Sequence, residues 1–293
     1  FSLFIFVLFA HSLKAQDDLL DMLENENQKN SITYANATFK SNRLVNGHSV
    51  EMVGEGVLNF VISHKFGRLN SGFYDLFGLD DANIRLGFDY GFSDRFNAGF
   101  GRNSFEKTYD GYLKYQLLRQ SSGQRTTPIT LTAFSSIAIN TLKPADESRE
   151  ISFEHRSSYV HQLLIARKFT SNFSLQLMPS WIHHNLVKEK EDRNDIIALG
   201  TGARYKLTPR TSLNFEYYYQ FHKNAPEGNF NALALGMDIE TGGHVFQLFI
   251  SNSRAMVAKS FISETTGDFL KGDIHFGFNV SRVFNLKKST ENK

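Results

Sequence analysis

The sequence contains no cysteine, which excludes disulfide bonds, thiol catalysis and zinc–thiolate sites. The formal net charge is only +2, which gives no electrostatic case for a nucleic-acid partner, because such a partner requires a basic patch or stripe. The mean hydropathy is -0.32, and no apolar run after residue 16 approaches the ~20 residues of a transmembrane helix. These absences exclude a helical membrane protein. Phosphate-loop, dinucleotide and paired metal-ligand motifs are also absent, so we expect no cofactor and no metal.

Phenylalanine and glycine are abundant by contrast, with 28 Phe and 21 Gly against five Pro. Aromatic side chains suit a pleated sheet and helices tolerate glycine poorly, so this composition favours strands. The chain begins with an apolar run from Phe1 to Ala10, followed by a short polar stretch and the small residue Ala15. This order is typical of a secretory signal, and the run is too short for a membrane anchor. We predict a signal peptide over residues 1–15.

Apolar and polar residues alternate in many segments of the chain. In the first clear example, Ile84, Leu86, Phe88 and Tyr90 alternate with Asn83, Arg85, Gly87 and Asp89. A period of two places the apolar side chains on one face of a strand. The other clear repeats lie at 96–100, 213–222 and 274–281, and weaker ones lie near 57–66, 110–118, 128–140, 157–168, 173–183, 196–206, 232–239 and 245–251. The pattern predicts about twelve strands.

These strands are close to the length of about 9 to 11 residues that a tilted strand needs to cross a bilayer, whereas a soluble β-sandwich usually has shorter strands. The links between them alternate between long and short, as in outer-membrane barrels, where long loops are extracellular and short turns are periplasmic. We therefore predict an all-β fold, a transmembrane antiparallel up-and-down β-barrel of about 12 strands over 55–285, with a tail over 286–293. Both termini should be periplasmic, and the long link 252–271 should face outward and be exposed.

Two features of the predicted strands do not fit the alternation. Pro179 removes a ladder donor from its strand and should mark a bulge or a strand end. The stretch 161–166 is apolar on both faces, so the alternation does not assign its register.

The segment 16–54 precedes the barrel and contains two different pieces. Residues 17–28 space their apolar side chains as a short acidic amphipathic helix, most simply a periplasmic leader. Residues 38–52 show no clear period, and two interpretations remain open for them: a linker, or a segment tucked into the lower lumen as a plug. The second follows from four apolar residues that should be buried somewhere: Phe39, Leu44, Val45 and Val50.

Several stretches of the sequence resemble a known protein family. The stretches ATFKSNRLVNGHSVE, GVLNFVISHKFG, SGFYDLFGLDDANIRLGFDYGFSDR and KTYDGYLKYQLLRQ are similar to a Bacteroidota β-barrel family, domain of unknown function 5777. The resemblance covers nearly all of the chain after the signal and is densest from Ala37 to Gln120. It implies an outer-membrane barrel and transfers no catalytic residue.

Charged residues mark the predicted inward face. If the apolar face contacts lipid, the lumen contains a network of both signs: Lys65, Arg85, Asp89, Arg95, Asp110, Lys114, Arg204, Glu216, Asp238 and His275. A selective pore is expected to have a ring of one sign, whereas mixed signs suit a cross-strand network that fills a small barrel. Two pairs flank tight turns and should meet across adjacent strands, Asp89 with Arg95 and Arg204 with Glu216.

The histidines give a weak signal for chemistry. His183 and His184 are adjacent, so on a strand they point to opposite faces and cannot chelate one ion together. Ser180 and His184 share a face, which is the minimum for a lipase-like nucleophile and base, but the sequence identifies no third residue and no oxyanion feature. We predict that the chain is not an enzyme.

The sequence thus predicts an outer-membrane β-barrel that serves as a small-solute channel or transport component. The alternative is a filled barrel with a structural role or an envelope protein as its partner, and a lipid-modifying enzyme is a third option. Outer-membrane lipid is the expected surrounding partner in each case.

Overall fold

The structure is a computed structural model that describes residues 31–144, 152–187, 190–221 and 228–287. The predicted signal peptide and the helix expected over 17–28 lie outside these residues, as does most of the predicted tail.

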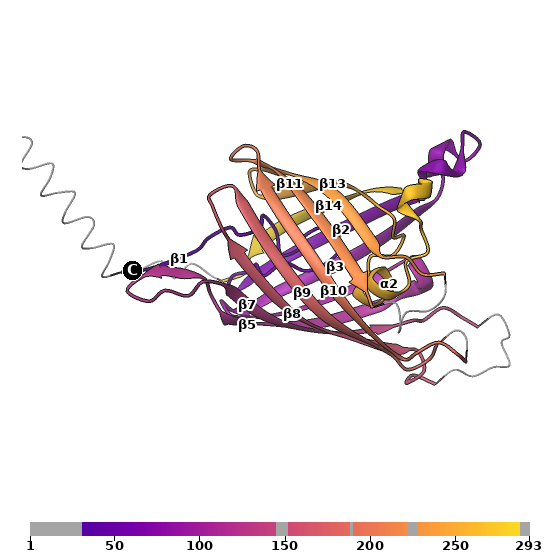
Figure 1. Ribbon diagram of the computed structural model, residues 1–293, viewed down its shortest axis with the longest axis horizontal. Helices are drawn as coiled ribbons and strands as arrows, with labels where there is room; N and C mark the ends of the chain where they lie inside the picture. The colour runs from indigo at the N-terminus through magenta and orange to yellow at the C-terminus, as the bar shows by residue number, and fades with distance from the viewer. Residues whose placement is uncertain (1–30, 145–151, 188–189, 222–227, 288–293) are drawn as a thin grey trace, which may run out of the picture.

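Twelve antiparallel strands of the described chain close into one barrel, each paired with its neighbour in the sequence, and the last strand pairs with the first (Figure 1). The strands are β2 (Val57–Arg68), β3 (Ala82–Ser93), β4 (Phe96–Asn103), β5 (Tyr109–Leu118), β7 (Thr130–Ile139), β8 (Ser157–Lys168), β9 (Phe173–His184), β10 (Asp195–Lys206), β11 (Thr211–Gln220), β12 (Ala232–Thr241), β13 (His244–Ser251) and β14 (His275–Asn285). The predicted fold class is confirmed.

The long and short links gather at opposite ends of the barrel, here named the long-loop end and the short-turn end. One short link is more than a turn, because β6 (Ser121–Gly123) pairs with β1 (Ile32–Tyr34) in a small separate sheet. Figure 1 shows this sheet extending beyond the short-turn end. The first barrel strand begins and the last barrel strand ends at that same end.

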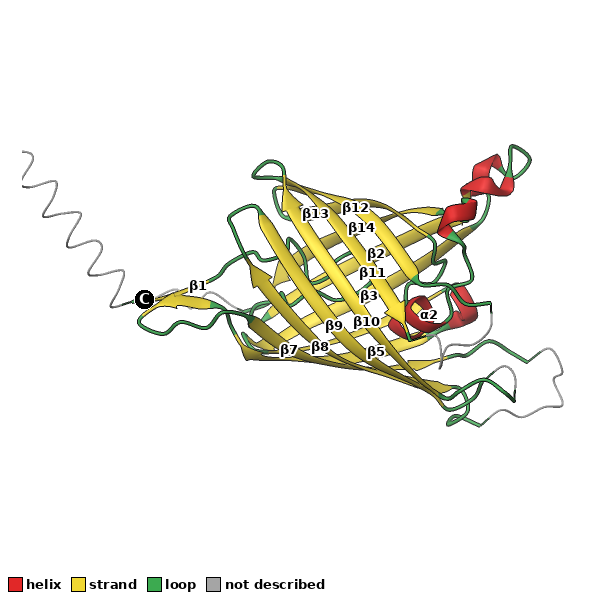
Figure 2. Cartoon of the chain, in the orientation of Figure 1, coloured by secondary structure: helices red, strands yellow, loops and turns green. Residues whose placement is uncertain are grey.

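Short helices lie at the long-loop end (Figure 2). They are the α-helix α2 (Ala258–Ser263) and the 3-10 turns η1 (Leu69–Ser71), η2 (Leu76–Gly78), η3 (Phe105–Lys107) and η5 (Phe269–Lys271). Among the described residues, no helix is long and apolar enough to span a membrane.

The outer face of the barrel is apolar because alternate side chains of each strand point outward. In β3, for example, Ile84, Leu86 and Phe88 are exposed while Arg85 and Asp89 are buried. The stretch 161–166, whose register the sequence did not assign, follows the same rule. Leu163 faces outward with 44% exposure, and Leu164 faces inward with 0%.

Pro179 lies within β9 and marks neither a strand end nor a shift of register. The pairing of β8 with β9 skips two positions beside it and resumes in the same register, whereas the pairing of β9 with β10 is continuous. Proline has no N–H to donate, so its effect here is a gap in one ladder. The expectation of a bulge or a strand end was wrong.

The lumen is filled by two segments that enter from opposite ends. Residues 38–54, here named the plug, enter at the short-turn end, and the buried Phe39, Leu44 and Val50 belong to them. Residues 252–271, here named the loop insert, enter at the long-loop end and include α2. The linker interpretation of 38–52 was therefore wrong. So was the expectation of an exposed link at 252–271, because Thr265 is only 2% exposed.

Candidate functional site

The plug folds as a narrow hairpin inside the barrel. Its arms are joined by a bridge between Arg43 and His48 and by a hydrogen bond of 3.0 Å from the Ser49 N–H to the Asn42 carbonyl. A tight turn at 44–47 forms the tip, where the Leu44 N–H donates to the Gly47 carbonyl at 2.9 Å. Three backbone N–H groups at this tip point away from the hairpin and need acceptors from the barrel wall.

Glu216 of β11 supplies those acceptors. Its carboxylate accepts hydrogen bonds from the N–H groups of Val45, Asn46 and Gly47 at 3.0, 3.1 and 3.0 Å. Bonds of this kind, with a charged acceptor, are roughly twice as strong as bonds between neutral groups. Glu216 is therefore the main polar anchor of the plug tip.

Other wall side chains bind the plug in the same manner, through its backbone. Gln176 donates to the His48 carbonyl and accepts from the Val50 N–H, both at 2.8 Å. Gln247 donates to the Leu44 carbonyl, and Asn279 donates to the Val45 carbonyl at 3.1 Å. The wall thus replaces the partners that the backbone of an isolated hairpin would find in water.

Apolar contacts complete the fit of the plug. Phe39, Leu44 and Val50 join one buried cluster with inward side chains of the wall, among them Leu164 and Met178. The wall leaves room for this contact because position 202 is a glycine, and a Cβ atom built on Gly202 would collide with the Leu44 side chain. Similarly, a Cβ atom on Gly47 would lie 2.5 Å from the Tyr218 hydroxyl oxygen. These glycines allow the hairpin and the wall to approach closely.

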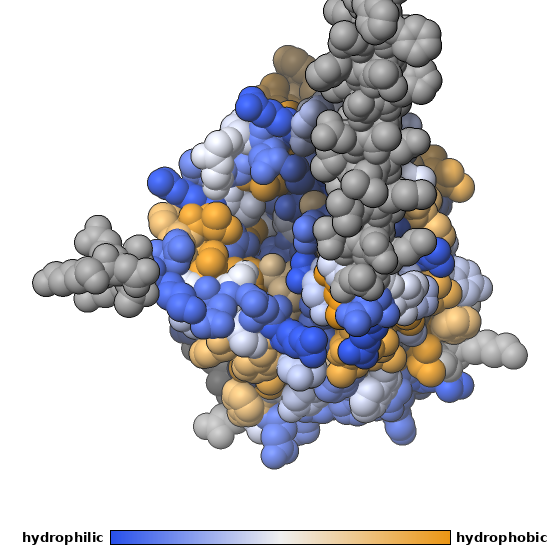
Figure 3. Space-filling view, turned by 90° about the vertical axis from the view of Figure 1, so that its left-hand side faces the viewer, coloured by the Kyte–Doolittle hydropathy of each residue, from blue (hydrophilic) through white to orange (hydrophobic). Residues whose placement is uncertain are grey.

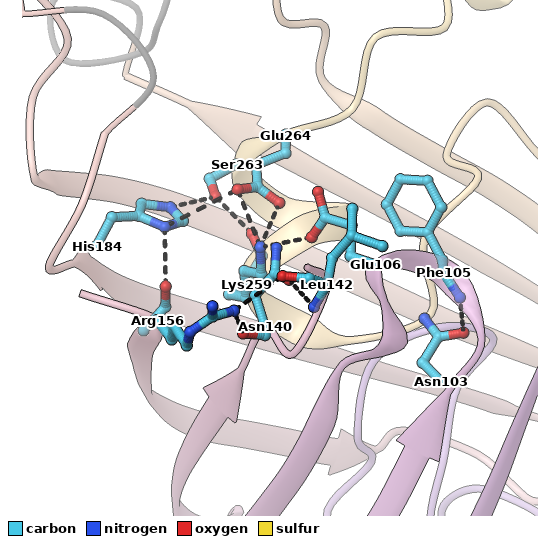
Figure 4. A network of polar contacts seen from close by, with 11 residues as sticks. Asn103, Phe105, Glu106, Asn140, Leu142, Arg156, His184, Lys259, Ser263 and Glu264 are labelled. Carbon is cyan, nitrogen blue, oxygen red and sulfur yellow. Dashed lines mark hydrogen bonds and ion pairs between the residues drawn. The ribbon is translucent and has the colours of Figure 1, made fainter. Parts of the chain in front are cut away.

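The loop insert is tied to the opposite mouth by an ion cluster, shown in Figure 4. The Lys259 ammonium contacts the carboxylates of Glu106 and Glu264 at 3.2 and 2.9 Å. Burial acts to lower the pKa of Lys259, but the attraction of Glu264 and Glu106 outweighs it and raises this pKa above its ordinary value. Burial likewise acts against the Glu264 carboxylate, and the attraction of Lys259 overcomes it and lowers the pKa of Glu264. The cluster is charged at neutral pH.

His184 binds the loop insert and not the serine that the sequence paired with it. Its Nε2 lies 2.9 Å from the Ser263 hydroxyl, and its Nδ1 lies 3.2 Å from the Ser158 hydroxyl. Ser180 instead accepts from Gln162 and donates to the Met178 carbonyl. The Ser263 hydroxyl donates to the Lys259 carbonyl and is fully buried, so it is not placed as a nucleophile. These contacts attach α2 to the wall (Figure 4).

Of the ten residues predicted to form the lumen network, Arg95 alone is not in the lumen. The structure places Arg95 in an exposed turn, and the other nine residues are buried in the barrel interior: Lys65, Arg85, Asp89, Asp110, Lys114, Arg204, Glu216, Asp238 and His275. The strand β3 runs to Ser93, so the turn is shorter than the sequence suggested and Arg95 lies within it.

Neither predicted charge pair forms. Asp89 accepts from Tyr112 at 2.6 Å and from Asn42 of the plug at 2.6 Å. Arg204 lies opposite Asn214 in the ladder, and its guanidinium donates to the Ala37 carbonyl at 2.8 Å. Arg204 and Glu216 do not pair because both bind backbone groups of the inserted segment. Asp89 and Arg95 do not pair because Arg95 lies in the exposed turn outside the lumen.

One cross-wall ion pair does form, and the sequence did not pair its members. The Arg85 guanidinium makes two hydrogen bonds with the Asp110 carboxylate, at 2.9 and 2.5 Å. The two residues lie on β3 and β5, with the glycine-rich β4 between them. Its two glycines, Gly99 and Gly101, give the Arg85 and Tyr112 side chains space to reach across.

The neutral amides that bind the plug were missed as well. Gln176, Gln247 and Asn279 occupy inward positions of their strands, which the alternation identifies. Neutral side chains give no charge signal, so these amides were not predicted as plug-binding residues although the alternation marks their inward positions.

A pocket lies at each mouth of the filled barrel. At the long-loop end a pocket of about 630 Å³ lies beside the loop insert and is lined by Ser253, Ala255 and His275 among others. At the short-turn end a pocket of about 260 Å³ is lined partly by the plug, including Thr38 and Glu51. Figure 3 views this end and shows hydrophilic residues gathered on it. The plug lies between these two pockets.

The sequence and the fold both have relatives. The family described as a membrane-bound β-barrel domain, DUF5777, matches residues 39–284. The chain belongs to this family. The matched region includes most of the plug together with the barrel, so both are parts of the DUF5777 domain. No curated protein sequence matches the chain.

Solved structures with similar folds are outer-membrane barrels. The NanC porin is similar with 8% identity and a TM-score of 0.50, covering 77% of this chain and 98% of that chain. The COG4313 outer membrane channel from Pseudomonas putida F1 has 14% identity and a TM-score of 0.47, covering 80% and 98%. Outer membrane phospholipase A from Escherichia coli has 10% identity and a TM-score of 0.43, covering 78% and 93%. At these identities the likeness concerns the fold alone, which is that of a closed β-barrel.

Proposed function

We propose that this DUF5777 protein is a small-solute channel, or a transport component, of the bacterial outer membrane, and that its plug closes the lumen. The proposal includes export through a signal peptide over 1–15, both termini in the periplasm, and an origin in Bacteroidota. The barrel contacts outer-membrane lipid on its apolar outer face.

The observation that carries this proposal is the way in which the plug is bound. It enters and leaves the lumen at the short-turn end, with Ala37 beside Arg204 at its start and Val53 beside Asn97 at its end. A hairpin with both ends at one mouth can withdraw as a unit, without threading through the barrel. Most of its polar contacts are wall side chains that bind its backbone, and both the wall and the backbone can be hydrated once the hairpin leaves.

The composition of the wall also supports a lumen that opens. A permanently filled interior gains little from buried charges, because well-packed apolar residues of similar volume are usually at least as stable. The inner face nevertheless carries eight charged residues on its strands: Lys65, Arg85, Lys114, Arg204, Asp89, Asp110, Glu216 and Asp238. Such a wall is suited to contact with water and solutes.

A filled structural barrel with an envelope protein as its partner is the second candidate, and one observation favours it. The buried cluster joins Phe39, Leu44 and Val50 of the plug with Phe261 and Ile262 of the loop insert. The two inserts therefore share one apolar core. In a structural barrel this core would never open, and a bilayer containing the protein would stay silent.

An enzymatic role is the third candidate, and we propose that the chain has none. His184 is buried, and its serine partners are Ser158 of β8 and the fully buried Ser263 of α2. We expect purified protein to release no fatty acid from phospholipid vesicles, with or without calcium. Release that His184→Ala abolishes would contradict this part of the proposal.

The channel proposal is tested by weakening the plug anchor alone. Glu216→Gln keeps the size of the side chain and removes the charge that the three N–H groups contact. Asp238→Asn is the matched control, because its carboxylate accepts from Ser212 and Gln247 of the wall and contacts no plug backbone. Loss of a charged acceptor weakens plug binding by about 1.5 to 3 kcal/mol, which is about a tenfold or larger rise in open probability.

The measurement is single-channel recording of the full-length purified proteins in planar bilayers. We expect Glu216→Gln to open often, and the parent and Asp238→Asn to open rarely. Silence of Glu216→Gln, in a variant that still migrates as a folded barrel on an unboiled gel, would reject the channel and favour the structural barrel.

A further inference from the structure

The charges of the lumen wall differ in what binds them. Four cations and four carboxylates are buried on the inner face of the strands, so the wall as a whole has no formal net charge. One cation and one carboxylate, Arg85 and Asp110, neutralise each other within the wall. Among the remaining six residues, the cations and the carboxylates depend to different degrees on the plug and the loop insert for their hydrogen-bond partners.

Three wall cations are bound by backbone carbonyls of the inserted segments. Lys114 donates to the Glu51 carbonyl of the plug at 2.5 Å, and Arg204 donates to the carbonyl of Ala37 at the plug's start. Lys65 donates to two carbonyls of the loop insert, those of Ser253 and Ala255, at 2.7 and 2.8 Å. In the part of the chain that the structure describes, no carboxylate forms an ion pair with any of these three cations.

The wall carboxylates depend less on the inserts. Asp89 keeps the Tyr112 hydroxyl and the Asn59 amide as donors when the plug is absent. Asp238 keeps Ser212 and Gln247. Glu216 alone is bound through the plug backbone. Withdrawal of the plug therefore leaves two cations, Lys114 and Arg204, without these acceptors and only one carboxylate, Glu216, without donors, whereas Lys65 stays bound to the loop insert.

The three cations also lie at successive heights along the lumen. Lys65 is close to the long-loop end of β2, Lys114 is near the middle of β5, and Arg204 is close to the short-turn end of β10. A solute that crosses the barrel passes each of them in turn. Peptide carbonyls occupy these positions in the closed state, and a carboxylate, sulfonate or phosphate presents the same kind of oxygen acceptor with a full negative charge.

The rest of the wall suits an apolar body on such a solute. Leu44 and Val50 of the plug pack in one cluster with inward side chains of β8 to β10, including Leu164, Met178 and Ile196. This surface becomes available when the plug withdraws, on strands next to the charged part of the wall.

We propose that the open lumen binds and conducts organic anions that combine an acidic group with an apolar body, and that Lys114 and Arg204 bind the acidic group. This inference rests on the proposed channel function and adds its substrate class. The plug then acts as an internal mimic of the solute, since it offers oxygen acceptors to the cations and apolar side chains to the neighbouring strands.

The test uses two probes of the same shape and opposite charge, benzoate and benzylammonium. The full-length chain is opened by Gly47→Val, because the added side chain would collide with Tyr218 and weaken the binding of the plug. This substitution changes only the plug and leaves every wall charge in place. Leu44→Ala is a second opening variant in case the first folds poorly. In planar bilayers with potassium chloride, the half-blocking concentration of each probe is measured.

We expect benzoate to block the open current at a concentration about tenfold lower than benzylammonium does. Lys114→Gln in the same background should raise the half-blocking concentration of benzoate at least about threefold. Arg95→Gln is the matched control, because it also removes one positive charge but lies in an exposed turn outside the lumen. It should leave the block unchanged.

The outcomes separate the two proposals. A current that benzylammonium blocks as well as benzoate does, or a block that Lys114→Gln leaves unchanged, overturns the substrate class and leaves the channel standing. Folded opening variants that never conduct overturn the channel itself, and the substrate class with it.

Discussion

The inner faces of β2–β5 and of β7–β10 belong to the same barrel and have different chemistry. The first carries five of the eight buried wall charges: Lys65, Arg85, Asp89, Asp110 and Lys114. The second carries one of them, Arg204, and places apolar side chains beside neutral polar ones; the apolar ones include Phe134, Val160, Leu164, Met178, Ile182 and Ile196. The first, polar part donates hydrogen bonds to carbonyls of the plug, and the second, more apolar part adds side-chain packing to the hydrogen bonds that Gln176 and Arg204 make. One hairpin can therefore be bound firmly by the wall and still leave a surface that water can wet.

The polar part of the wall should be the more sensitive to single changes. Arg85→Met leaves the Asp110 carboxylate buried without its ion-pair partner, and an uncompensated buried charge costs about 3 to 5 kcal/mol. Adding Asp110→Leu removes that charge and should restore much of the loss. Urea unfolding of the barrel in lipid vesicles measures both variants. If the double variant is no more stable than the single one, the loss in Arg85→Met does not come from an unpaired Asp110 carboxylate, and the two residues do not act as an ion pair.

The apolar part of the wall should respond through packing alone. Leu164→Ala removes a fully buried side chain from the cluster that contacts the plug and should cost about 3 kcal/mol. Leu163→Ala is the control, because the neighbouring side chain points outward, and its loss should cost less. Unfolding by urea distinguishes them. Equal losses would mean that the register of β8 is wrong.

The loop insert should show the smallest effect and the clearest dependence on pH. Because the pKa of Glu264 is lowered from its ordinary 4.5, its ion pair stabilises the insert at neutral pH, and this contribution is lost as the pH falls through the lowered pKa. Glu264→Gln should loosen the insert by about 2 kcal/mol at neutral pH, and acid should add little further loosening.

Limited proteolysis between residues 252 and 271 measures this loosening. Glu55→Gln is the control, since Glu55 pairs with Lys287 in an exposed contact. Parent protein that is cleaved as fast at neutral pH as in acid below the lowered pKa of Glu264 would show that the ion pair does not anchor the insert.

The sequence was sufficient to predict the barrel and the inward position of most of its charges. Strand alternation reports which side of a sheet a residue occupies, and it does so independently of what fills the lumen. It could not report the partner of an inward residue, since Arg204 and Glu216 both bind backbone groups of a segment with no period of its own. The Asp89–Arg95 pair failed for a different reason, an error of about two residues in a turn boundary.

One feature of the sequence indicates a filled lumen, although the prediction did not use it. The stretch 161–166 is apolar on both faces, which a water-filled barrel would not need. An inward Leu164 requires an apolar partner within the barrel, and Phe39, Leu44 and Val50 were the unassigned apolar residues. Together they favoured the plug over the linker.

The central claim is that the plug must move for the barrel to conduct, and a reversible crosslink tests it most directly. A Cβ atom built on Gly236 lies 3.1 Å from the Val45 side chain, so Val45→Cys with Gly236→Cys places two thiols within disulfide reach. The chain has no other cysteine. In the Glu216→Gln background, the account predicts that oxidation silences the channel and that reduction in the same bilayer restores its openings. Equal conductance before and after reduction, with the crosslink verified by mass spectrometry, would contradict it.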